Sequence, residues 1–207
     1  MSNETERTNP HEHRDRGRGQ SLVEFALVLP LLLVLLLGLA DFGRVFAAGI
    51  TMEAAARNAA EVAAQEYLQN RRDSVPASTD DFDRIRRMAL ERLCAEADPL
   101  PNQAAAGLTC SMPAAAVCIH DSADELVNYG GQCGAGASAA PGECTSLHDP
   151  WPASAPATGQ LPWVEVRACY RFTTIFNLED LRMPFGGELS LGTIWLQRDR
   201  SFTVADY

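Results

Sequence analysis

Apolar residues dominate the chain from Phe25 to Ala40, where no charged residue interrupts a run rich in Leu and Val. Further apolar residues flank this run on both sides. A helix through the segment is long enough to cross the roughly 30 Å of hydrocarbon in a membrane. The pattern therefore predicts a transmembrane helix over residues 20–41, preceded by a polar leader of residues 1–19.

Behind the run, small and apolar residues recur at steps of three and four, so the helix is expected to continue from Ser21 to about Gln69. This stripe consists of Phe42, Val45, Gly49, Met52, Ala56, Ala60, Ala63 and Tyr67. Glu53, Arg57 and Glu61 lie on another face as pairs of opposite charge four residues apart. We expect the stripe to pack on the protein's own core, with a partner helix as the alternative.

A second amphipathic helix is predicted from Asp80 to about Ala97, within a helical region of residues 42–98. Thr79 or Asp80 is expected to cap its N-terminus, because acidic residues fill the first turn that follows. The buried stripe of this helix is predicted to be Phe82, Ile85, Ala89, Leu93 and Ala97.

Residues 99–160 are rich in Pro, Ala, Gly and Ser and are expected to form an irregular insert. The cysteines of the chain are Cys94, Cys110, Cys118, Cys133, Cys144 and Cys169. An even number in one stretch indicates disulfides and an oxidising compartment, and no pair has the close spacing of a zinc site. Spacing leaves the connectivity open, with Cys133–Cys144 as the favoured local pair.

From residue 161 the pattern changes to strict alternation, which predicts a half-buried strand. Its apolar positions are Val164, Val166, Ala168, Tyr170 and Phe172, and between them lie Glu165, Arg167, Cys169 and Arg171. The sequence FGGE at residues 185–188 predicts a turn. A second strand is expected to contain Leu189, Leu191, Thr193 and Trp195, with residues 201–204 extending the sheet. Residues 161–207 should thus form an antiparallel β-meander on the amphipathic helix, and the predicted fold class is α+β.

The basic residues next to the apolar run set the predicted topology. Arg14, Arg16 and Arg18 precede the run, so the positive-inside rule places the leader in the cytoplasm and the cysteine-rich part outside. Oxidised cysteines agree with this orientation. The formal net charge of -10 argues against nucleic acid as a partner. We therefore expect a single-pass protein of the cytoplasmic (inner) membrane with an extracytoplasmic C-terminal domain.

A signal peptide or a plain membrane anchor is the alternative interpretation, because small residues ending at Ala40 also suit signal peptidase. Glu24 and Pro30 count against it. A carboxylate near the start of an apolar run costs on the order of 2 kcal/mol or more unless it has a partner. Pro30 is expected to bend the helix.

The order of Gly19, four further residues, Glu24 and Phe25 ahead of a long apolar helix resembles the processing site of type IV prepilins. The stretch RGQSLVEFALVLPLLLVLLLGLADFGRVF, with its Pro and its Gly-x-x-Asp-Phe-Gly-Arg exit, is similar to the TadE-like family. This is a family of minor pilins or pseudopilins of tight-adherence (Flp) pilus systems. The resemblance covers roughly residues 17–67, with a looser similarity in the C-terminal strands.

This resemblance implies that a prepilin peptidase cuts between Gly19 and Gln20. It also implies that Glu24 neutralises the new amino group on Gln20, in its own chain or in a neighbouring subunit, and that Phe25 belongs to the same motif. The implied partners are the prepilin peptidase, the major Flp pilin, other minor pilins and the platform proteins of the machine. The implied role is assembly of an adhesion pilus.

No catalytic motif stands out, since the four histidines have no convergent polar partners in the sequence. We expect no enzyme, no cofactor and no metal site. The rival hypothesis is a membrane-anchored extracellular binding domain unrelated to pilus assembly, with residues 99–160 as its ligand-binding insert. Only the pilin hypothesis requires Gly19 and Glu24.

Overall fold

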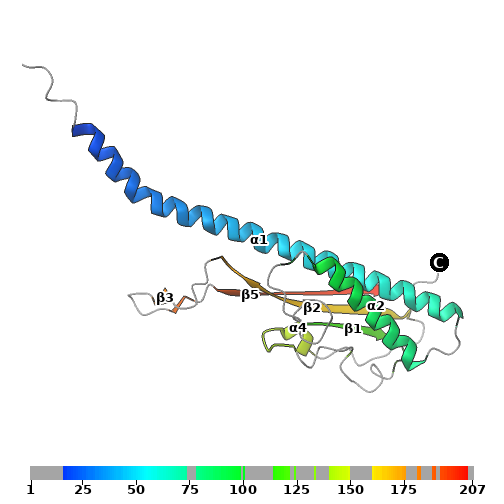
Figure 1. Ribbon diagram of the computed structural model, residues 1–207. Helices are drawn as coiled ribbons and strands as arrows, with labels where there is room; N and C mark the ends of the chain where they lie inside the picture. The colour runs from blue at the N-terminus through cyan, green and yellow to red at the C-terminus, as the bar shows by residue number, and fades with distance from the viewer. Residues whose placement is uncertain are drawn as a thin grey trace, which may run out of the picture. The chain divides into compact units, whose positions relative to one another are not determined.

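The computed structural model of the chain describes residues 16–73, 78–98, 100, 114–121, 124, 133, 140–149, 160–175, 181–182, 188–189 and 192–204. Its elements are α1 (Arg16–Asp73), α2 (Thr79–Ala97), β1 (Ala114–His120), α4 (Thr145–His148), β2 (Trp163–Thr173), β3 (Leu181–Arg182), β4 (Glu188–Leu189) and β5 (Thr193–Thr203) (Figure 1). The chain divides into two compact units, Met1–Arg44 and Val45–Tyr207. Two long helices with an antiparallel sheet confirm the α+β fold class.

Helix α1 contains both helical patterns of the sequence and continues without a break through Pro30. It extends a few residues beyond each expected boundary. In the first unit the side chains from Gln20 to Leu36 are exposed. Among the described residues, α1 is the one helix long and apolar enough to cross a membrane, and none of its most apolar window is buried. Exposed apolar surface of this extent needs lipid or protein to cover it. The bend expected at Pro30 stays a prediction.

The core of the second unit lies between helices and sheet. One cluster of buried side chains joins the C-terminal half of α1, α2 and one face of the sheet. From α1 it takes the predicted stripe from Met52 to Tyr67, in which alanines predominate. Because Ala side chains are short, the backbone of α1 can approach the sheet closely. Larger side chains, among them Phe82, Tyr170 and Phe172, fill the remaining space.

The predicted stripe of α2 is confirmed, since its five residues are at most 2% exposed. The expected cap was wrong by one or two residues. Ser78 is the N-cap and forms a capping box with Asp81: its hydroxyl accepts from the Asp81 amide, and the Asp81 carboxylate accepts from the Ser78 amide. Hydrogen bonds from the Ser78 hydroxyl and amide lower the pKa of Asp81.

The main sheet has the strand order β1-β2-β5, with β2 in the centre and both pairings antiparallel. The apolar positions of β2 are buried as the alternation predicted. Arg167 and Cys169 between them are buried as well, because α4 covers this part of the other face, so the strand is not half-buried throughout. Strand β5 includes residues 201–203, so the expected extension is part of it. Leu189, however, does not belong to that strand: it lies in β4, which pairs with β3 in a separate ribbon. Of the expected turn at 185–188, residues 185–187 lie outside the described residues.

The expectation of an irregular insert over residues 99–160 was wrong in two places. Strand β1 and the short helix α4 both lie within it. All seven residues of β1 are buried, so the strand shows no alternation between apolar and polar residues. In its sequence, AAAVCIH, three of the seven residues are alanine, which is a weak strand signal.

Two disulfides are seen among the described residues, Cys118–Cys133 and Cys144–Cys169. The favoured pair Cys133–Cys144 was therefore wrong, because each of these residues binds a cysteine in the sheet instead. Cys118 lies in β1 and Cys169 in β2, and strand register, which local spacing does not reveal, sets their positions. Cys94 is disulfide-bonded as well, and Cys110 lies outside the described residues.

Helix α4 covers one end of the second face of the sheet. Leu147 and the Cys144–Cys169 disulfide pack there against Ala114, Ala116 and Trp195. Two side chains from the sheet bind the backbone of Ser146 in this helix. Gln197 accepts from the Ser146 amide at 2.7 Å, and Arg167 donates to the Ser146 carbonyl at 2.9 Å. Figure 1 shows α4 on the side of the sheet opposite α1.

Candidate functional site

The predicted processing and assembly residues lie in the first turns of α1. Gly19 and Gln20 are helical, and Pro30 lies within the same helix. The Gln20 side-chain amide donates to a Glu24 carboxylate oxygen at 3.1 Å. Phe25 is 61% exposed. The N-terminus of this helix therefore presents a carboxylate four residues after the predicted cut, on the same face as Gln20.

An ion pair and two glycines without close neighbours lie at the C-terminal end of the apolar run. Arg44 donates to Asp41 at 3.0 Å, one turn earlier on the helix. A Cβ atom added at Gly38 or Gly43 would meet nothing within 4 Å. The first unit itself thus gives no packing reason for glycine at either position.

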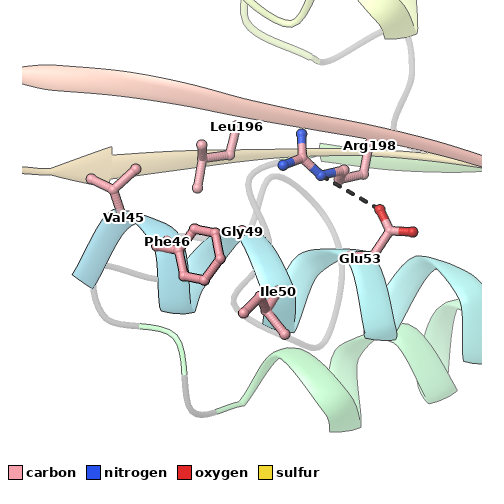
Figure 2. Close-up of a pocket in the computed structure, with 7 residues that line it drawn as sticks. All are labelled: Val45, Phe46, Gly49, Ile50, Glu53, Leu196 and Arg198. Atoms are coloured by element: carbon pink, nitrogen blue, oxygen red, sulfur yellow. Dashed lines mark ion pairs between the residues drawn. The ribbon is translucent and has the colours of Figure 1, made fainter. Parts of the chain in front are cut away.

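In the second unit, a groove of about 300 Å³ lies between α1 and β5 (Figure 2). Its lining is Val45, Phe46, Gly49, Ile50, Glu53, Leu196 and Arg198. Phe46 is 63% and Ile50 56% exposed. A Cβ at Gly49 would touch the tip of the Arg198 side chain at 3.4 Å, an ordinary contact. The groove is apolar along its length and charged at one end.

Glu53 closes the charged end of the groove. Its carboxylate lies 3.6 Å from Arg198 Nε and also accepts from Arg200 (Figure 2 shows the pair with Arg198). The sequence suggested instead that Glu53 pairs with Arg57 along the helix. Both arginines of the actual cluster come from β5, 145 or more residues away in the chain. Local spacing could not have indicated this contact.

A second polar cluster ties the C-terminal part of α1 to the end of β1. The Tyr67 hydroxyl donates to Asp121, and Arg71 Nε donates to the same hydroxyl at 2.9 Å. Arg71 also lies 3.3 Å from the Asp121 carboxylate. Burial, reinforced by the hydrogen bond to Asp121, raises the pKa of Tyr67 well above its ordinary value. These contacts fix the register between helix and strand.

Catalytic chemistry has little support in the described part of the chain. No group of three or more His, Cys, Asp or Glu side chains among the described residues is placed to bind a metal ion. His120 is fully buried and stacks on Trp163, whereas His148 is exposed and lies 3.0 Å from the Pro141 carbonyl oxygen. His11 and His13 lie outside the described residues.

Comparison with known proteins bears on the first helix. The model of the TadE-like protein family matches residues 19–61. The match begins at the predicted cleavage site and ends within α1, and it confirms the resemblance that the sequence motif indicated. No curated protein and no solved structure matches the chain. The sheet and its disulfides lie outside the matched segment, because the first strand begins at Ala114.

Proposed function

We propose, from the TadE-like identity of residues 19–61, that this chain is a minor pilin or pseudopilin. TadE-like proteins are pilus-associated structural proteins. In this proposal a prepilin peptidase cuts after Gly19, and the mature chain acts in the assembly of an Flp-type adhesion pilus. The observation that carries the proposal is the exposed apolar half of α1, which begins with a carboxylate and lies inside the matched segment.

The position of Glu24 supports a cut before Gln20. An unpaired carboxylate at the start of a membrane helix is unfavourable. Cleavage before Gln20 creates an α-amino group one helical turn away from Glu24, in its own chain or in a neighbour. In the uncut chain, the Glu24 carboxylate accepts a hydrogen bond from the side-chain amide of Gln20. The charge pair thereby sets the axial register of the helix in an assembly.

The open glycines support helix packing between subunits. Glycine within a helix is less favourable than alanine by about 0.5–1 kcal/mol. Nothing within 4 Å would obstruct a methyl group at Gly38 or Gly43. Small residues in membrane helices allow close approach of another helix. We assign these positions to contact with a neighbouring subunit, such as the major Flp pilin or another minor pilin.

The proposed topology follows from the same helix. The leader faces the cytoplasm, where the prepilin peptidase and the platform proteins reach it, and the second unit faces outward, where its disulfides stay oxidised. The protein then resides in the inner membrane until it enters or supports the pilus.

Replacement of Gly19 tests this function. In a host that carries the prepilin peptidase, G19L is expected to keep its leader, because a side chain at this position blocks entry into the protease. G17L is the matched control and should be processed like the wild type. Loss of the leader is read as a mobility shift on an immunoblot. Processing of G19L at the wild-type rate would contradict the proposal.

Replacement of Glu24 separates processing from assembly. E24Q should still lose its leader but should be reduced in sheared pilus fractions, because the amide cannot neutralise the new amino group. E61Q, which changes an exposed carboxylate of α1 in the second unit, is the control for general effects on the helix. Incorporation of E24Q into pili at the wild-type level would contradict the role of Glu24. Absence of both the wild type and E24Q from pilus fractions would favour the rival hypothesis, a membrane-anchored binding domain.

A further inference from the structure

A polar hollow of about 390 Å³ lies on the sheet, outside the segment that matches the TadE-like family. Trp163, Glu165, Asp199, Arg200 and Ser201 line it. In the register of β2 and β5, Glu165 is opposite Ser201, and Asp199 is two residue pairs further along, opposite Arg167. Since side chains alternate between faces, Trp163, Glu165, Asp199 and Ser201 share the face of the sheet opposite α1. The hollow is thus built by two neighbouring strands rather than by loops.

The Trp163 ring is held in place by stacking on a histidine of the neighbouring strand. Trp163 is opposite His120 of β1, and the two rings stack with centroids 4.4 Å apart and planes inclined by 11°. His120 is fully buried. Trp163 itself is partly exposed and lines the hollow. A fixed, partly exposed indole offers a flat apolar surface and an N–H donor at low entropic cost.

Glu165 is likewise held in a single orientation. Arg167 Nε donates to one carboxylate oxygen at 2.7 Å, and His120 Nε2 lies 3.3 Å from the other. Burial opposes ionisation of Glu165, but the nearby His120 ring and the hydrogen bond from Arg167 outweigh it and lower the pKa of Glu165. The carboxylate is therefore an ionised acceptor whose charge is already balanced by Arg167.

Asp199 and Ser201 are the open groups of the hollow. Both side chains are exposed. Within the described part of the chain, neither the Asp199 carboxylate nor the Ser201 hydroxyl makes a hydrogen bond or an ion pair. Arg200, between them in β5, binds Glu53 of α1. Among the described residues, the hollow thus has one acceptor and one group that both donates and accepts without a partner.

This combination selects among ligand classes. A cationic ligand would call for acceptors only, and an anionic ligand for donors only. Here the lining combines carboxylates and a hydroxyl with a tryptophan, and the charges of Glu165 and Arg200 are paired within the protein. Hydroxyl groups of a sugar both donate and accept, and the C–H face of a pyranose packs on an aromatic ring. We propose that this hollow binds a neutral oligosaccharide, with Trp163 as the stacking surface for one sugar ring and Glu165, Ser201 and Asp199 as hydrogen-bond partners along the strands.

The test uses the purified full-length chain in a detergent without a sugar headgroup, since alkyl glycosides would compete. The protein is applied to an array of immobilised neutral and acidic oligosaccharides, and the strongest signal is followed by calorimetric titration with that free oligosaccharide. D199A should weaken binding by about tenfold or more, because a hydrogen bond to a charged group is lost. S201A should weaken it by a smaller factor, and W163A should abolish it.

The exposed positions keep the proposal falsifiable even if W163A disturbs the fold. Among the described residues the side chains of Asp199 and Ser201 make no hydrogen bond or ion pair, so their variants should unfold at the wild-type denaturant concentration. E91A, an exposed carboxylate on α2, is the matched control and should bind like the wild type. Absence of array binding, binding of acidic oligosaccharides alone, or equal affinity of D199A and wild type would overturn the proposal. The uncut precursor suffices for these measurements, so the result is independent of leader processing.

Discussion

The ion pair between Arg86 and Asp124 gives the sharpest prediction about stability. Arg86 is on α2, and its side chain is 4% exposed; the side chain of Asp124 is fully buried. Arg86 also pairs with the half-exposed Asp83 at 3.1 Å. Removal of the guanidinium would leave the Asp124 carboxylate without this partner in a buried position. Breaking a buried pair in this way typically costs about 3–5 kcal/mol.

The variant R86M removes the charge and keeps the apolar stem, so the expected loss comes from electrostatics rather than from packing. R84M on the same helix is the matched control. Arg84 lies 3.3 Å from Glu66 with 44% of its side chain exposed, and an exposed pair of this kind contributes less than about 1 kcal/mol.

The free energy of unfolding is measured by urea titration of the full-length chain in mild detergent, followed by tryptophan fluorescence. R86M is expected to lower it by about 3–5 kcal/mol, and R84M by no more than about 1 kcal/mol. D124N should be destabilising as well, and R86M/D124N should lose less than the sum of the two single changes, because the pair is coupled. Equal losses for R86M and R84M would refute the assignment of Asp124 as a buried charge that needs Arg86.

Three further predictions test other parts of the structure. G49A should stabilise the second unit by about 0.5–1 kcal/mol, because a methyl group there meets only the flexible tip of Arg198; a lower urea midpoint than wild type would contradict this. Tyr67 ionises in the folded state only at a raised pKa, so its contribution to stability is complete below pH 10 and falls as the pH rises further. Y67F should therefore lose less stability than wild type between pH 9 and 11, and parallel pH profiles would count against the buried hydroxyl. Peptide mapping without reduction should yield Cys118–Cys133 and Cys144–Cys169, and a Cys133–Cys144 peptide would contradict the sheet register.

The helices could be predicted from the sequence because their signal is local. The stripe of α1 from Met52 to Tyr67 and that of α2 follow the helical period, and the core lies on the faces that this period indicates. Strand β2 could be predicted for the same reason, since one of its faces is apolar throughout.

Strand β1 and the disulfides could not be predicted because they depend on contacts between distant segments. Burial on both faces removes the alternation from β1. The partner of Cys169 is decided by the placement of α4 over the sheet, which no spacing in the sequence encodes. Glu53 likewise finds its arginines in β5 and not on its own helix.

The predicted processing residues have a different status. Gly19, Gln20, Glu24 and Phe25 were identified from a motif, and the family match covers them. Among the described residues, the Glu24 carboxylate makes one hydrogen bond, with the Gln20 side chain. Its role therefore depends on the fate of the leader.

The N-terminus of the mature protein tests this account most directly. It is determined by mass spectrometry of the protein from membrane and pilus fractions, in a host with and without its prepilin peptidase. The account predicts a mature chain that begins at Gln20 in the presence of the peptidase and an intact leader in its absence. A chain that begins near Asp41, or one that keeps its leader in both hosts, would contradict it.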